Sequence, residues 1–197
     1  MISAILLSAG ESSRFGSPKA LVKLNSYTVI EQILTSLISS QVDEVITVLG
    51  SQAEQIKPFL LKHKKVKVVY NKDYNFGQTS SFQVGLNSLR DDSQGVFLLP
   101  VDYPFVKSST IDTLIECFRI ERNGVYIPTF ENRKGHPPLF PIQLRNEFLL
   151  LQHDQGVNSV AQQHQDLIRL VAVKDSGVIA TFNTPQEFDL ISKKIGR

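Results

Sequence analysis

The chain has 197 residues, of which 42% are hydrophobic and 20% charged, a composition typical of a soluble globular protein. This length fits a single domain over residues 1–197 that buries a sizeable core. A formal charge of +2 argues against nucleic acid as a partner, and the single cysteine excludes an internal disulfide. No apolar run reaches the length of a membrane span and no secretory leader is visible, so we expect a cytoplasmic protein without membrane contact.

Short apolar runs alternate with helical patterns through the first two thirds of the chain. Thr28 with Glu31, and Ser51 with Glu54, have the spacing of capping boxes that open helices, and Ser109 is a further candidate cap. Near-continuous apolar strands in alternation with helices predict a parallel sheet covered on both faces. The predicted strands cover residues 2–8, 44–49, 66–70, 95–100 and 125–130, and the predicted helices cover residues 29–38, 51–61, 80–89 and 109–121.

The pattern changes after residue 130. A polar loop at 131–138 is marked by glycine and proline, and helical patterns at 143–151 and 157–164 precede a strand at 167–173. We interpret this part as an insertion over the edge of the sheet that then returns to it, and not as a second domain. Further on, Thr184, Pro185 and Glu187 have the spacing of the cap, first and third positions of a terminal helix.

Four loops that follow predicted strands carry most of the chemically useful side chains. They cover residues 9–19, 71–81, 101–106 and 131–138. In open α/β sheets, ligands bind beyond the carboxyl ends of the strands, so these loops are expected to meet at one edge. The functional site is therefore predicted at this edge.

The first of these loops has the composition of a phosphate-binding loop. Gly10 and Gly16 let the backbone approach a polyphosphate, and Arg14 and Lys19 offset its charge. The spacing is neither that of a Walker loop nor that of the Gly-x-Gly-x-x-Gly dinucleotide motif. The alternative interpretation is a surface turn after an edge strand.

The run Leu7-Ser-Ala-Gly-Glu-Ser-Ser-Arg-Phe-Gly-Ser-Pro-Lys19 resembles a known signature. It is similar to the Leu-Ala-Ala-Gly-x-Ser-x-Arg-Met-Gly-x-x-Lys element of the MobA-like NTP transferases, which attach nucleotides to the molybdenum cofactor. Ser8 and Phe15 depart from it mildly. The resemblance implies an α/β three-layer sandwich with a mainly parallel sheet, of the nucleotide-diphospho-sugar transferase type. It also implies Mg²⁺-dependent transfer of NMP from an NTP to a phosphorylated acceptor, with release of pyrophosphate.

The resemblance also implies a set of nucleotide-binding residues in two loops. Residues 77–85 are similar to a Gly-Met-Ser-x-Ser-Leu-x-x-Gly element of the cytidylyl branch, although helix capping alone accounts for one serine there. Arg14 and Lys19 are expected to be catalytic by neutralising the phosphates and the leaving pyrophosphate. The expected nucleotide-binding residues are Ser8, Ala9, Gly10, Ser12, Ser13, Arg14, Lys19, Asn71, Gly77, Ser80 and Ser81.

Asp102 is the main candidate for a metal ligand. It follows the most apolar predicted strand, and Mg²⁺ prefers carboxylate oxygens. It resembles the family's catalytic Gly-Asp-x-Pro element, with Val101 in place of the glycine, while an Asp-x-Pro turn is the structural alternative. Asn183 stands where many relatives have aspartate and is the second expected ligand, with a plain helix cap as its alternative. The expected cofactor is Mg²⁺, or Mn²⁺ in its place.

The loop at 131–138 resembles the family's Gly-His-Pro element on the acceptor side. Gly135, His136 and Pro137 are accordingly expected to bind or orient the acceptor, and His136 is not expected to transfer a proton. Together with the first loop, this element favours CTP and a molybdopterin-type acceptor, as in molybdenum cofactor cytidylyltransferases, and a transient contact with an apo-molybdoenzyme. Two alternatives stay open. One is a nucleotidyltransferase for a sugar-, inositol- or alditol-phosphate, and the other is a non-catalytic accessory protein that binds the cofactor for molybdenum hydroxylases.

Overall fold

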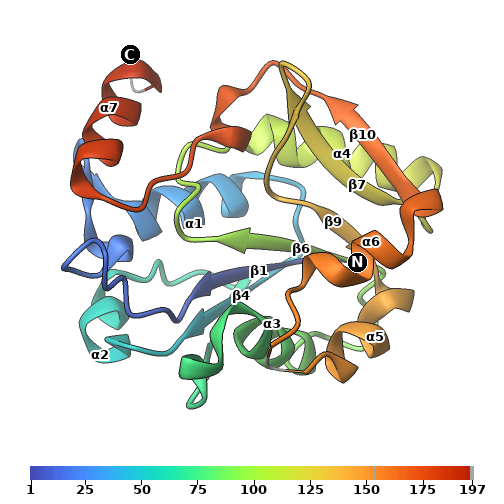
Figure 1. Ribbon diagram of the computed structural model, residues 1–197, viewed down its shortest axis with the longest axis horizontal. Helices are drawn as coiled ribbons and strands as arrows, with labels where there is room; N and C mark the ends of the chain where they lie inside the picture. The colour runs from blue at the N-terminus through green and yellow to red at the C-terminus, as the bar shows by residue number, and fades with distance from the viewer. Residues whose placement is uncertain (153, 196–197) are drawn as a thin grey trace.

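A mixed sheet forms the centre of the molecule in the computed structural model, which describes residues 1–152 and 154–195 (Figure 1). Its strands follow the order β10-β7-β9-β6-β1-β4-β5, and β8 pairs with β7. The strands are β1 Ile2–Ser8, β4 Glu44–Leu49, β5 Val66–Tyr70, β6 Gly95–Pro100, β7 Val125–Phe130, β8 Arg133–Lys134, β9 Leu139–Pro141 and β10 Ile168–Ala172, and a separate pair is formed by β2 Lys23–Leu24 and β3 Tyr27–Thr28.

Helices cover both faces of this sheet (Figure 1). The apolar side chains of α1, α4 and α7 join one buried cluster with Ala4 and Leu6 of β1, and those of α3, α5 and α6 join a second cluster with Ile5 and Leu7. Successive residues of β1 therefore point to opposite layers, as expected for a strand buried on both faces. The α/β three-layer prediction is confirmed. The α-helices are α1 Val29–Ser39, α2 Ala53–Ile56, α3 Gly77–Asn87, α4 Ser108–Ile120, α5 Arg145–Leu150, α6 Asn158–Gln163 and α7 Pro185–Ile195.

One predicted capping box is confirmed at the start of α1. The Glu31 main-chain N–H donates to Thr28 Oγ1 at 3.4 Å, and the Thr28 N–H donates to Glu31 Oε2 at 2.6 Å. The Thr28 hydroxyl also donates to Glu31 Oε2 at 2.7 Å, and this hydrogen bond, followed by that from the Thr28 N–H, holds the pKa of Glu31 below its ordinary value. The helix therefore begins where the sequence predicts.

The predicted capping box at Ser51 and Glu54 is wrong. Gln52 adopts a left-handed conformation with φ of 59°, no side chain caps α2, and this helix ends at Ile56. The Ser51 N–H instead donates to Ala9 O at 2.9 Å, so the chain here is tied to the end of β1. Pro58 then lies in a short 3₁₀ turn, Lys57–Phe59, because its ring and missing N–H do not suit a longer α-helix.

Two other helix starts also differ from the prediction. Helix α3 begins at Gly77, so Ser80 and Ser81 lie inside its first turns and do not cap it. Helix α4 begins at Ser108 and Ser109 is no cap. No side chain caps α4; the carboxylate of Asp175 instead fixes the start of the helix, because its Oδ2 accepts the Lys107 N–H at 2.9 Å and the Thr110 hydroxyl at 2.7 Å.

The segment after residue 130 enters the sheet instead of lying over its edge. Strand β9 pairs antiparallel with both β6 and β7, and its three residues are buried. Strand β10 lies at the edge, parallel to β7. The apolar run Leu139–Pro141 suits the interior of the sheet, because Leu139 and Phe140 pack into the two opposite buried clusters while β6 and β7 pair with its backbone. The interpretation of residues 131–173 as an edge insertion is corrected accordingly.

The four loops expected to meet do lie at one edge of the sheet. Strands β1, β4, β5 and β6 are parallel neighbours, and β7 runs in the same direction because β9 is antiparallel to both β6 and β7. Their carboxyl ends therefore face the same side. In the part of the chain that the structure describes, no helix is both long and apolar enough to cross a bilayer.

Candidate active site

The loop after β1 is held in a tight turn by its own backbone. Ser12 has a φ of 54°, and its carbonyl accepts the N–H groups of Phe15 at 2.8 Å and Gly16 at 3.2 Å. Ser12 Oγ accepts the Lys19 N–H at 3.2 Å. A side chain at Gly10 would meet nothing within 4 Å, so the backbone there borders open space. This is the arrangement that close approach of a phosphate to main-chain N–H groups requires.

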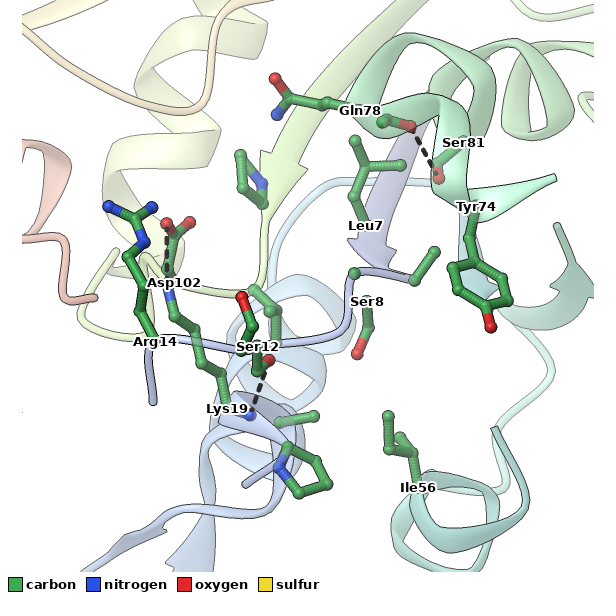
Figure 2. A pocket seen from close by; sticks show the side chains of 18 residues that line it. Leu7, Ser8, Ser12, Arg14, Lys19, Ile56, Tyr74, Gln78, Ser81 and Asp102 are labelled. Atoms are coloured by element: carbon green, nitrogen blue, oxygen red, sulfur yellow. Dashed lines mark hydrogen bonds and ion pairs between the residues drawn. The ribbon is translucent and has the colours of Figure 1, made fainter. Parts of the chain in front are cut away.

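A cleft of about 290 Å³ opens between this loop, the start of α3 and the end of β6 (Figure 2). Arg14, Lys19 and Asp102 lie at one end of it, and Tyr74 and Ile56 lie at the other, as Figure 2 shows. We call it the nucleotide cleft. The predicted site residues that line it are Ser8, Ala9, Gly10, Ser12, Ser13, Arg14, Lys19, Gly77, Ser81 and Asp102.

Three charged groups and one amide meet at the end of the nucleotide cleft. Lys19 Nζ lies 3.6 Å from Asp102 Oδ2 and donates to Asn183 Oδ1 at 3.1 Å. Arg14 Nη2 donates to the same Asn183 oxygen at 3.2 Å. Arg14 and Asn183, which are 169 positions apart in the sequence, are thus brought together at this end of the cleft.

Asp102 has the features of a cation ligand. Its Oδ1 is buried and has no hydrogen-bond partner, so this carboxylate is not fully satisfied by the protein. Within the described residues, no group of three or more His, Cys, Asp or Glu side chains is placed to hold a metal ion. A cation here would therefore rely on one carboxylate, on neutral oxygens such as Asn183 Oδ1, and on ligand oxygens. This donor set suits a hard divalent cation that keeps waters or phosphates.

Asn71 and Ser80 lie behind the wall of the nucleotide cleft. Asn71 is buried, and its Nδ2 donates to Ser80 Oγ at 2.9 Å and to Ser81 Oγ at 3.0 Å. Ser80 Oγ in turn donates to Gly77 O at 2.9 Å. Of these residues only Gly77 and Ser81 border the cleft, so the others fix the loop after β5 from beneath.

A second cleft of about 700 Å³ lies beyond Asp102, on the side of β7 and β10. We call it the second cleft. Its lining includes Tyr103, Lys134, Gly135 and His136, whereas Pro137 is buried and does not border it. Gly135 is required there because an added Cβ would lie 2.3 Å from Val178 O. The two other predicted acceptor residues, Gly135 and His136, thus come together as expected.

His136 packs against Tyr103 in the lining of the second cleft. Their ring centroids are 4.4 Å apart, and His136 Nδ1 is buried without a hydrogen-bond partner. Burial lowers the pKa of His136, against smaller raising effects from the Leu98 backbone and the Asp102 carboxylate. The pKa of Tyr103 is raised, first by burial and then by Asp102. Both rings are therefore neutral near pH 7, in keeping with a binding role for His136.

Several lining residues could not be identified from the sequence. Tyr74 and Gln78 border the nucleotide cleft, and Gln162 borders the second one. An aromatic residue in a loop after a strand was the available signal for Tyr74. Gln78 stands at the methionine position of the similar element in relatives, which was the signal there. Gln162 carries no local signal, because an exposed glutamine on a short helix is ordinary.

The comparisons with known proteins agree with this geometry. The model of the family described as MobA-like NTP transferase domain matches residues 4–167. A probable molybdenum cofactor guanylyltransferase from Natranaerobius thermophilus is 26% identical over 209 residues, covering 100% of this chain and 97% of that protein. The crystal structure of Rv0371c from Mycobacterium tuberculosis H37Rv has a TM-score of 0.84 at 25% identity, covering 98% of this chain and 97% of that one. A crystal structure of Rv0371c in complex with manganese has a TM-score of 0.80 at 23% identity, with the same coverage of 98% and 97%.

Proposed function

The chain belongs to the MobA-like NTP transferase domain family, and from that premise we propose that it transfers CMP from CTP to a molybdopterin-type acceptor with release of pyrophosphate. The observation that carries this proposal is the meeting of Lys19, Arg14 and the unsatisfied Asp102 between two clefts. Asp102 borders the nucleotide cleft, and its neighbour Tyr103 borders the second cleft. An acceptor phosphate and an α-phosphorus can therefore meet beside one carboxylate.

The chemistry asks the protein for positioning and charge stabilisation. An acceptor phosphate oxygen attacks the α-phosphorus, and the bond to the pyrophosphate oxygen breaks, so no protein nucleophile is needed. Main-chain N–H groups beside Gly10 orient the triphosphate, and Arg14 and Lys19 stabilise the charge on the leaving pyrophosphate. Asp102 and Asn183 would hold a divalent cation, Mg²⁺ or Mn²⁺, which neutralises phosphate charge when it is bound.

The choice of CTP rests on the first loop and the start of α3, where residues 7–10 and 77–81 resemble the cytidylyl branch of the family. Ala9 lines the nucleotide cleft but is 3% exposed, and its Cβ faces the backbone of Gly50. We therefore expect Ala9 to act on base selection through the position of the cleft wall. The relative from Natranaerobius thermophilus carries the name of a guanylyltransferase, so GTP is the competitor that matters most.

The second cleft supports a flat acceptor more than a polyol. Its floor includes Ile127, Phe140 and Ile168, and Lys134 is its only charged lining residue in the described part of the chain. Apolar side chains suit the face of a pterin, and a lysine suits its phosphate. We further propose that the acceptor is delivered to, or leaves toward, an apo-molybdoenzyme by transient contact.

Pyrophosphate release tests this proposal. The protein is incubated with Mg²⁺ or Mn²⁺ and molybdenum-loaded molybdopterin, with CTP, GTP, ATP and UTP supplied separately. Release that is fastest with CTP is the expected result, and release only with GTP would overturn the nucleotide assignment. No release with any nucleotide despite cofactor binding would favour the accessory-protein alternative. Release only with sugar- or alditol-phosphates as acceptors would overturn the molybdopterin assignment.

A further inference from the structure

The ammonium group of Lys19 lies inside a cluster of three oxygen atoms from two parts of the chain, Asp102 after β6 and residues 182–183 before α7. It donates to Phe182 O at 2.7 Å and to Asn183 Oδ1 at 3.1 Å, and it lies 3.6 Å from Asp102 Oδ2. The Lys19 side chain is 12% exposed, and its Nζ is 5.3 Å from the centroid of the Phe182 ring. The ammonium group that would bind a triphosphate is therefore already bound to oxygen atoms of the protein.

The same three oxygens are the kinds that a hard divalent cation binds. A carboxylate, a side-chain amide and a main-chain carbonyl are all usual ligands of Mg²⁺, Mn²⁺ or Ca²⁺. Arg14 Nη2 also donates to Asn183 Oδ1, but the Lys19 ammonium lies among all three oxygens. A divalent ion bound to the same three oxygens would lie at contact distance from this ammonium, and the two would repel each other. Either Lys19 or the metal therefore occupies it.

Lys19 is the member of the cluster that can move. The Asn183 N–H donates to Glu187 Oε2 at 2.6 Å, which fixes the Asn183 main chain at the start of α7. Asp102 follows directly from the buried strand β6. Lys19 has a flexible stem, borders the nucleotide cleft and would find new partners in phosphate oxygens there.

We propose that Lys19 and the divalent cation exchange for one set of ligands, in which the main-chain carbonyl of Phe182 is the third oxygen. Before the nucleotide binds, Lys19 occupies the cluster and keeps the metal out. The triphosphate then draws Lys19 into the nucleotide cleft, and the cation takes its place. Nucleotide and metal consequently bind together, and the metal alone binds weakly. This inference rests on the proposed function only in taking a divalent cation to be used at this site.

Binding of Mn²⁺ alone, followed by the EPR signal of the free ion, tests the exchange without nucleotide or acceptor. Lys19→Met removes the ammonium and keeps the stem, so this variant should bind one Mn²⁺ roughly tenfold or more tightly than the wild type. Lys19→Gln serves as a second variant, in case one of the two does not fold by circular dichroism. Lys19→Arg keeps the charge and should bind as weakly as the wild type.

Lys23→Met is the matched control. Lys23 is exposed, belongs to the same stretch and also lies near a phenylalanine ring, with its Nζ 6.0 Å from the Phe59 centroid. Its loss removes the same net charge without opening the cluster, so the affinity for Mn²⁺ should stay at the wild-type value. Adding Asp102→Asn to Lys19→Met should abolish the gain.

Two results would overturn the exchange. One is an unchanged affinity in the folded Lys19 variants, and the other is a gain that Lys23→Met shares or that survives the loss of Asp102. Neither result bears on turnover, because no nucleotide is present. Conversely, a failure to release pyrophosphate would count against the proposed function and leave the metal-binding result as it stands.

Discussion

The two clefts on either side of Asp102 are built in opposite ways. The nucleotide cleft takes most of its lining from one continuous stretch, residues 7–20, and its chemistry depends on charged side chains and main-chain N–H groups. The second cleft is larger and collects its lining from β7, β8, β9, α6, β10 and the loops between them, mostly apolar side chains and neutral amides. Under the proposed function, the nucleotide cleft recognises the triphosphate, which all NTPs share. The second cleft recognises the particular acceptor.

Loss of Asp102 should have the largest effect, because this carboxylate is the proposed metal ligand and lies next to Tyr103 of the second cleft. Asp102→Ala is expected to lower turnover by about 10³-fold, as the loss of an electrostatic group at a reacting phosphate does. Stability should not fall, since Oδ1 is buried and unsatisfied in the folded protein. Initial rates of pyrophosphate release and thermal unfolding measure both quantities. Asp91→Ala, at an exposed carboxylate, is the control, and an undiminished rate in Asp102→Ala would remove this residue from the site.

Lys19 should affect the nucleotide side alone. Lys19→Met is expected to lower kcat/KM for CTP by about 10²-fold, because one charge no longer stabilises the leaving pyrophosphate. The KM of the acceptor should stay unchanged, which initial rates at varied acceptor concentration measure. Lys23→Met should leave the kinetics alone. An equal change in the kinetic parameters of CTP and of the acceptor would mean that Lys19 acts on both clefts.

Ala9 should set the nucleotide preference. Ala9→Gly removes the methyl group that faces the Gly50 backbone and loosens the cleft wall at this point, so the ratio of kcat/KM for CTP to that for GTP should fall by roughly tenfold. Competition between the two labelled nucleotides measures this ratio directly. A ratio that stays constant would show that base selection depends on other residues of the nucleotide cleft.

Gln162 should affect the acceptor side alone. Gln162→Leu removes a neutral hydrogen-bonding group from the second cleft, so the acceptor KM should rise by about three- to tenfold while the CTP KM stays unchanged. The neighbouring Gln163 does not line this cleft, and Gln163→Leu is therefore the matched control. Similar acceptor kinetics in the two variants would contradict a direct contact with Gln162.

The buried, neutral ring of His136 should make a small, pH-dependent contribution to the free energy of unfolding. Burial lowers the pKa of His136 in the folded protein below 6.5, its ordinary value in the unfolded chain. As the pH falls below 6.5, the unfolded state takes up a proton before the folded state does. The free energy of unfolding therefore decreases over this range, until the pH is below the pKa of the folded state as well. The unfolding free energy of His136→Asn should therefore decline less than that of the wild type between pH 7.5 and 5.5. Equal declines would show that His136 is not the group responsible.

The sequence was most informative where a contact is local. Thr28 and Glu31 lie three positions apart and form the predicted capping box, and the apolar strands fall at the predicted residues. Ser51 and Glu54 have the same spacing, but a hydrogen bond from Ser51 to Ala9 decides the backbone there. At α4, Ser109 is no cap, and the helix start is fixed by the distant carboxylate of Asp175 through Lys107 and Thr110. Such distant partners leave no mark in a local pattern.

The residues of the candidate site also differ in how far the sequence alone predicts them. The first loop could be recognised because its glycines, serines and basic residues are consecutive. Gln162 could not be recognised, since it reaches the second cleft only because β9 enters the sheet and β10 closes its edge. The hydrogen bond from Lys19 Nζ to Phe182 O could not be predicted either, because a main-chain carbonyl has no sequence signature.

Transfer of label from [α-³²P]CTP to the acceptor is the most direct measurement. The protein is incubated with molybdenum-loaded molybdopterin and a divalent cation, and label on the acceptor is compared with pyrophosphate released. A nucleotidyltransferase gives one labelled acceptor for each pyrophosphate, and Asp102→Ala gives neither. Pyrophosphate without labelled acceptor, or bound cofactor that stays unlabelled, would contradict nucleotidyl transfer by this protein.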